Sequence, residues 1–78
     1  MTTTMLDLTG LKCPLPALRT RKALLRLSPG ERLEVYCTDP MAVIDIPAMV
    51  QQLGDRIDSA ERRDDALVFI IARSDRAI

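Results

Sequence analysis

The stretch of sequence that decides the fold is GLKCPLP, at residues 10–16, in which a cysteine is followed by two prolines. Prolines are tolerated at the start of a helix, because the first helical residues make no intrahelical use of their N–H groups. If Cys13 is the N-cap, Pro14 falls at the first helical position and Pro16 at the third. Pro14 also favours the extended backbone that an N-cap residue adopts. We therefore predict a helix that begins directly after Cys13, with Gly10 permitting the turn that leads into it.

Cys13 is the candidate functional residue of this stretch. Its predicted place is the positive end of a helix dipole, near the N–H groups of Cys13, Leu15 and Ala17 and the cations Lys12 and Arg19. These surroundings favour a thiolate, so we expect the pKa of the Cys13 thiol to lie below its ordinary value of ~8.5. An anionic sulfur or a persulfide could be held there. The alternative is a structural role, as a small apolar side chain under the helix.

Length and charge limit the classes of function. A chain of 78 residues has room for one core, so we expect a single domain over residues 1–78. Eleven basic and eleven acidic residues give a net charge of zero, so we expect no direct binding to nucleic acid and no attraction to an anionic membrane. The N-terminal residues lack the pattern of an export signal, and no apolar run approaches the ~20 residues that span a bilayer. We expect a cytoplasmic protein.

The cysteine and histidine content narrows the chemistry further. Cys13 and Cys37 match neither a disulfide framework nor a CxxC metal pattern, and the chain has no histidine. A Cys–His dyad, a Ser–His–Asp triad and histidine-ligated zinc are therefore excluded within one chain. We expect no metal and no cofactor. The chemistry that remains for a thiol is group carriage, exchange or redox.

Hydrophobic periodicity and turn residues predict the order β-α-β-α-β-β. Strands are expected at 5–8, 32–37, 56–62 and 66–73, and helices at 14–27 and from about 40 to 53, where Gly54 ends the second one. Right-handed crossovers put both helices on one face of a four-stranded mixed sheet, which gives an α/β two-layer sandwich of the α+β kind. The last strand is apolar on both faces, so we expect it inside the sheet.

The first helix is expected to carry an apolar stripe and a basic stripe. The apolar side chains at helical spacing are Leu15, Ala17, Leu18, Leu24 and Leu25. The basic side chains Arg19, Lys22 and Arg26 fall at positions i, i+3 and i+7. This basic stripe is either a solvated helix face or a docking surface for acidic protein partners or tRNA beside Cys13.

The second helix begins near two candidate capping residues. Thr38 or Asp39 is expected as its N-cap, with Pro40 in the first turn. Pro47 falls inside the helical pattern and would either kink one helix or follow a short turn, with Asp45 capping a fresh helix. For both aspartates we expect capping rather than chemistry.

Cys37 closes the second strand and points to the apolar face of that strand. Because the first two strands are expected to be parallel, they end at one edge of the sheet, which brings Cys13, Cys37 and Asp39 close together. Cys37 could serve as a resolving thiol, but its apolar face favours a role in the core. On the side of the sheet without helices, we expect the last strand to expose an apolar strip, formed either by the pair Val68 and Ile70 or by the pair Phe69 and Ile71.

These residues resemble the TusA/SirA-like sulfur carrier proteins, whose hallmark is a Cys-Pro-x-Pro motif at the start of the first helix. Besides residues 10–16, the resemblance takes in Leu6-Asp7, Lys22, PGE at 29–31, TDP at 38–40 and DIP at 45–47, so it extends from Leu6 to Arg73. It implies the same two-layer fold, with the fourth strand inside a mixed sheet. It also implies that Cys13 receives a sulfane sulfur as a persulfide and relays it to an acceptor protein.

The resemblance thus implies a sulfurtransferase of the carrier type. The donor would be a cysteine desulfurase or a rhodanese-like protein, and the acceptor would serve tRNA thiolation, molybdenum cofactor biosynthesis or sulfur-compound oxidation. Cys13 is the expected catalytic residue, Gly10, Lys12, Pro14 and Pro16 position its thiolate, and the accessory candidates are Arg19, Lys22, Asp39 and Cys37. The alternative is a non-catalytic regulatory or redox-sensing binding module. A nucleic acid binder that uses the basic stripe is the weakest hypothesis at zero net charge.

Overall fold

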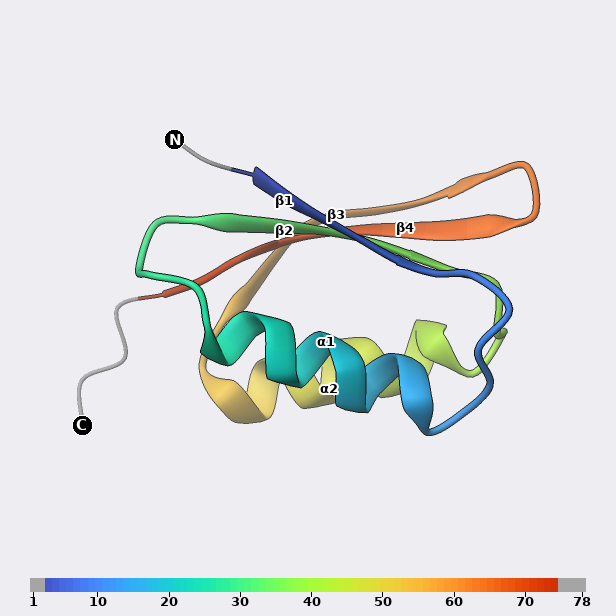
Figure 1. Cartoon of the computed structure of the whole chain (residues 1–78), viewed down its shortest axis with the longest axis horizontal. Helices are drawn as coiled ribbons and strands as arrows, with labels where there is room; N and C mark the ends of the chain where they lie inside the picture. Colours follow the sequence, from blue (N-terminus) through green and yellow to red (C-terminus); the bar gives the residue numbers. More distant parts are fainter. Residues whose placement is uncertain (1–2, 75–78) are drawn as a thin grey trace.

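A computed structural model of the chain describes residues 3–74 and contains two helices and four strands (Figure 1). The elements are β1 (Thr3–Leu8), α1 (Leu15–Leu25), β2 (Arg32–Cys37), α2 (Ala42–Leu53), β3 (Arg56–Arg63) and β4 (Ala66–Ala72). Both helices lie beneath one face of the sheet, and the other face carries no helix (Figure 1). The predicted order and the two-layer α+β sandwich are confirmed.

The sheet is mixed, with the strand order β1-β2-β4-β3. β1 and β2 are parallel, in a register from Thr3 opposite Arg32 to Leu8 opposite Cys37. β4 pairs antiparallel with β2 on one side and with β3 on the other, so it lies inside the sheet as its apolar sequence predicts. β1 and β3 are the two edge strands.

The buried face of α1 differs from the predicted leucine stripe. Pro16, Thr20 and Leu24 are the buried residues of this helix, whereas Leu15 is 43% exposed and Leu18 is 56% exposed. A face that starts at Pro16 continues at Thr20, Leu24 and the buried Leu27 by steps of four and three, which is the spacing of one helical face. The expected stripe is therefore confirmed at Leu24 and wrong at Leu15, Leu18 and Leu25, which are exposed.

α2 is one helix that runs through Pro47. The alternative of a fresh helix capped by Asp45 is therefore wrong. Gly54 ends the helix with φ of 81°, where its N–H bonds to the Gln51 carbonyl and the N–H of Asp55 bonds to the Val50 carbonyl. This pattern is a Schellman motif, which needs the left-handed conformation that glycine adopts without strain.

The face of the sheet without helices lacks the expected apolar strip. Val68 is only 1% exposed, and Phe69 and Ile71 belong to the core under the helices. Charged side chains from neighbouring strands pair on this face: Asp58 binds both Arg32 and Arg56, and Arg63 donates to the Tyr36 hydroxyl. Val68 is buried and Ile70 is half-buried on this face, so the exposed groups here include these charged and polar side chains.

Within the part of the chain that the structure describes, neither helix is long and apolar enough to cross a membrane.

Candidate functional site

The site lies where β1 and β2 end, because parallel neighbours bring their following loops to the same edge of the sheet. The N–H of Gly10 donates to the Thr38 hydroxyl oxygen at 2.8 Å. The N–H of Cys13 donates to the Asp39 carboxylate. Side chains of the loop after β2 therefore hold the backbone of the loop after β1. The predicted proximity of Cys13 and Asp39 is confirmed.

Gly10 is needed at the start of this loop. Its φ is +84°, a conformation that residues with a Cβ rarely adopt. The left-handed turn directs its N–H toward Thr38. The expectation that glycine permits the turn into the motif is confirmed.

Asp39 joins the motif to the second helix. One of its carboxylate oxygens accepts from Cys13, and the other accepts from the N–H of Met41 at 3.0 Å. The carbonyl of Asp39 also accepts from the N–H of Ala42, the first residue of α2. Met41, rather than the expected Thr38 or Asp39, is the N-cap residue of α2, and no side chain makes a capping hydrogen bond there, so the predicted cap was wrong. Pro40 likewise precedes the helix instead of lying in its first turn. The Asp39 carboxylate lies just before the helix, where it binds the N–H groups of both Met41 and Cys13.

The thiol of Cys13 is exposed and points to a carboxylate. Its Sγ–H donates to Oδ2 of Asp45 at 3.0 Å. This hydrogen bond, followed by partial desolvation and the negative charges of Asp45 and Asp39, raises the pKa of the Cys13 thiol. The expectation of a lowered pKa was wrong, because two carboxylates lie at the thiol.

The start of α1 also differs from the expectation. Pro14, rather than Cys13, is the N-cap residue, so the helix begins at Leu15 and Pro16 is its second residue. The Cys13–Pro14 peptide bond is cis. Of the N–H groups expected to face the sulfur, that of Cys13 binds Asp39 and that of Leu15 binds the Lys12 carbonyl. These two donors are therefore already used within the chain.

The other predicted site residues divide between two hollows. One, of about 280 Å³, lies beside the motif between the two loops; it is lined by Gly10, Leu11, Lys12, Thr38, Asp39 and Pro40. Arg19 and Lys22 line a different hollow, between α1 and β1. The structure therefore brings Lys12 and Asp39 together beside Cys13 and places the basic stripe elsewhere.

Cys37 is a core residue. Its side chain is 0% exposed and packs in the main apolar cluster. Burial and the charge of Asp39 raise the pKa of the Cys37 thiol to about 11. The inward orientation predicted from the strand pattern is confirmed.

Asp45 is the contact of Cys13 that the sequence reasoning missed. Its place one turn into α2 follows from the end of β2, since a helix that starts beside the Cys13 loop presents its first turn to that loop. The available signal was the DIP segment at 45–47, which forms part of the family resemblance but was interpreted only as a helix cap. Thr38, whose hydroxyl holds Gly10, was missed in the same way.

Exposed apolar side chains occur at or near the starts of both helices. They are Leu15 and Leu18 in α1, Met41 directly before α2, and Val43 and Ile44 within it. No group of three or more Cys, Asp or Glu residues within 3–74 is arranged to hold a metal ion. The site therefore offers the chemistry of one exposed thiol and a carboxylate.

Comparison with known proteins identifies the family. Residues 4–73 match the profile of the family described as Sulfurtransferase TusA. The chain belongs to the TusA family. It is 39% identical over 69 residues to the sulfur carrier protein TusA of Allochromatium vinosum, a match that covers 88% of this chain and 91% of the relative. The resemblance noted in the sequence is confirmed at the level of the family.

A solved structure supports the fold. The SirA-like protein from Desulfitobacterium hafniense superposes with a TM-score of 0.78, covering 96% of this chain and all of the other, at 24% identity. In the TusA family the general activity is sulfur transfer, which requires a protein that donates sulfur and one that accepts it.

Proposed function

We propose that this TusA-family chain carries a sulfane sulfur as a persulfide on Cys13. The observation that carries the proposal is the exposed thiol of Cys13. The backbone N–H of Cys13 donates to the Asp39 carboxylate, and its Sγ–H donates to the Asp45 carboxylate. The other cysteine of the chain is buried. Cys13 is therefore the thiol that a partner protein can reach without unfolding the core.

Loading of Cys13 requires a donor persulfide, supplied by a cysteine desulfurase or a rhodanese-like protein. Cys13 Sγ attacks the outer sulfur of the donor; a new S–S bond forms on Cys13, and the S–S bond of the donor breaks. Asp45 already accepts the hydrogen bond of the thiol at 3.0 Å, so it is placed to take the proton and return it to the leaving donor thiolate. The donor recovers its thiol, Cys13 gains one sulfur, and no external oxidant or reductant is needed.

Unloading is the same exchange in the opposite sense. A thiolate of the acceptor protein attacks the outer sulfur of the Cys13 persulfide and takes it, and Cys13 recovers its proton. The three destinations implied by the family, tRNA thiolation, molybdenum cofactor biosynthesis and sulfur-compound oxidation, all begin with this relay to an acceptor.

The carboxylates beside Cys13 give the resting carrier a protonated thiol, because they raise its pKa. Thiols react as thiolates, so a free carrier of this kind reacts slowly with oxidants and adventitious electrophiles. Transfer becomes fast only when a partner protein completes the site. A thiol that is unreactive until a partner binds suits a protein that must deliver its sulfur selectively.

Mass spectrometry of the intact protein tests the proposal. After incubation with a cysteine desulfurase and L-cysteine, the wild type and Cys37→Ala should each gain one sulfur atom, and Cys13→Ser should gain none. Circular dichroism of each variant controls for folding. Equal loading of Cys13→Ser, or no loading of the wild type by this donor and by a rhodanese charged with thiosulfate, would contradict the proposal.

A further inference from the structure

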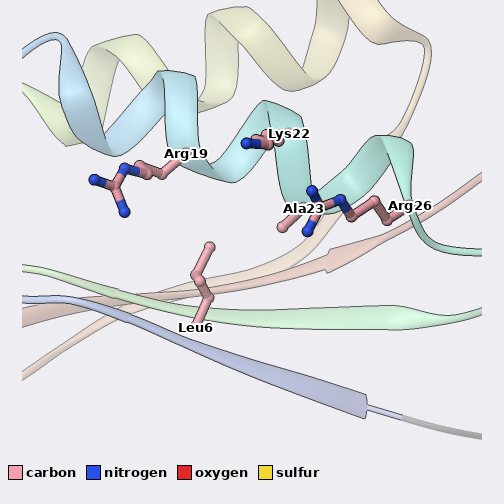
Figure 2. A pocket seen from close by; sticks show the side chains of 5 residues that line it. All are labelled: Leu6, Arg19, Lys22, Ala23 and Arg26. Carbon is pink, nitrogen blue, oxygen red and sulfur yellow. The ribbon is translucent and has the colours of Figure 1, made fainter.

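A basic groove lies between α1 and the edge strand β1, away from the Cys13 thiol. Its volume is about 470 Å³, and it is lined by Leu6, Arg19, Lys22, Ala23 and Arg26. Figure 2 shows Leu6 rising from β1 toward α1, and the three cationic side chains carried by the helix above it. The floor is therefore apolar and one wall is positively charged.

The three cations of the groove form no ion pair with any residue in the described range 3–74. Arg19, Lys22 and Arg26 follow one another along about 10 Å of helix, at a rise of ~1.5 Å per residue. Like charges held along one wall repel one another, and a ligand with several negative charges relieves that repulsion. A single small anion is too short to meet all three.

β1 offers the second half of the site, an open backbone edge. Among residues 3–74 it pairs with β2 on one side only, so its other side presents N–H and C=O groups that no strand of this range pairs. Edge strands are commonly blocked by lysine or proline, and TTMLDL contains neither. Its one charged side chain, Asp7, accepts hydrogen bonds from the N–H and hydroxyl of Thr9 and is turned toward that loop. The edge is therefore free to accept another strand.

We infer that this groove binds an extended, acidic segment of a partner protein, which adds to the edge of β1 as a fifth strand. Alternate side chains of a strand point to one face and repeat every ~6.8 Å, so two or three acids at alternate positions cover ~7 to 14 Å and match the row of cations. The residues between them point to the other face. Backbone pairing supplies affinity, and the acids select the register.

Nucleic acid fits this groove less well than an acidic segment. A phosphate backbone cannot form strand hydrogen bonds with β1, and three cations in a chain of zero net charge neutralise few phosphates. The apolar side chains of Leu6 and Ala23 in the lining favour a peptide as well.

The inference goes beyond the proposed function, because it concerns binding and needs no thiol. The groove runs back toward the end of α1 that follows Cys13, since Arg19 lies about one turn after Leu15. A partner segment anchored there would hold that partner on the chain during sulfur transfer.

Calorimetry with a synthetic peptide tests the binding. The probe is acetyl-Thr-Glu-Val-Glu-Val-Glu-Thr-amide, with a scrambled control in which the three acids are adjacent. Reversing the charge of Lys22 or Arg26 to Glu should weaken binding about fivefold or more, since each change replaces an exposed attraction by a repulsion. Arg21→Glu is the matched control, because this residue neighbours Lys22 but does not line the groove. Lys22→Gln and Arg26→Gln remove charge without reversing it and serve if a reversal impairs folding.

Two N-methylated peptides separate strand addition from charge attraction alone. Each carries methyl groups on alternate amides, in one of the two possible registers. Strand addition predicts that one register loses binding and the other keeps it, and that the amides of residues 4–8 shift in NMR spectra and exchange more slowly with solvent. Cys13→Ser should bind as the wild type does, so failure here is distinct from failure of sulfur carriage.

Several results would overturn the inference. They are equal affinity of the Lys22→Glu and Arg21→Glu variants, equal binding of the scrambled peptide, and full binding of both N-methylated peptides. Binding of tRNA at the groove in place of the peptide would assign the surface to nucleic acid.

Discussion

Replacing Cys37 by alanine tests whether this thiol belongs to the core or to the sulfur chemistry. Cys37 ends β2 with a fully buried side chain, and the pKa of its thiol is raised to about 11 by burial and by the charge of Asp39. A group of this kind should stabilise the fold at neutral pH and take no part in transfer. Stability is measured in a pair of proteins that lack Cys13, and sulfur loading in a pair that keep it.

The size of this contribution to the free energy of unfolding follows from the difference in the pKa of Cys37 between the folded and the unfolded chain. The thiol has an ordinary pKa of 9.0 and one of about 11 in the folded chain, a difference worth about 2 to 3 kcal/mol. Because the folded pKa is the higher one, this stability is fully present below pH ~9 and is lost as the pH rises toward 11. At pH ~10.5 about 2 kcal/mol of it should be gone, since the unfolded thiol ionises first.

Alanine removes this pH dependence and leaves a small cavity. Deleting one buried heavy atom costs about 1 kcal/mol, so Cys37→Ala should be less stable than the parent by that amount at pH 7. At pH ~10.5 the parent has lost about 2 kcal/mol that the variant keeps, so the order of stability should reverse.

Urea unfolding followed by circular dichroism measures the difference at pH 7, 9 and 10.5. Both proteins carry Cys13→Ser, so that Cys37 is the titrating thiol in which they differ, and the slope of unfolding free energy against urea concentration checks that the transition stays two-state. A stability difference that does not change with pH would refute the assignment of Cys37 to the core. In a chain that keeps Cys13, loss of sulfur loading on Cys37→Ala without loss of fold would make Cys37 a resolving thiol instead.

Three further substitutions test the site and the core. Asp45→Asn should lower the pKa of the Cys13 thiol, because it removes the charge that raises it, so iodoacetamide should alkylate Cys13 faster at pH 7; an unchanged pH–rate profile would contradict the hydrogen bond. Asp39→Ala removes acceptors for Cys13 and Met41 and should lower the unfolding free energy by about 1 to 2 kcal/mol in urea. Thr20→Val should raise it by about 1 kcal/mol, seen as an increase in Tm, because the Thr20 hydroxyl is buried without a hydrogen-bond partner among the described residues; destabilisation would show that it has one.

The arrangement of the elements could be predicted from the sequence because each signal is local. A run of apolar residues in the last strand places β4 inside the sheet, and Gly54 ends α2 by its conformational freedom. The meeting of Cys13 and Asp39 was predictable from topology alone, since parallel neighbours end at one edge. These inferences needed the order of the strands and no side-chain detail.

The phase of α1 and the acidity of Cys13 could not be predicted, because both depend on tertiary contacts. The hydrophobic pattern predicts Leu15 and Leu18 as core residues, but the helix packs on the sheet through Pro16, Thr20 and Leu24, and the two leucines are exposed. The helix dipole and Lys12 indicated an acidic thiol. In the structure, the thiol instead donates a hydrogen bond to the carboxylate of Asp45, which lies in the other helix and raises the pKa of Cys13.

Asp39 and Asp45 both bind Cys13, although the sequence pattern predicted only helix capping for them. Asp39 supplies acceptors at the start of α2 and binds the N–H of Cys13 with the same carboxylate, so the group that orders the loop also places negative charge at the thiol. A partner protein that brings a cation to this point would lower the pKa of Cys13 without moving the backbone. Activation and recognition would then be one event, because the thiol becomes a nucleophile only where the partner's charge complements the two carboxylates. A partner without that charge would meet a protonated thiol, and the sulfur would stay with its donor.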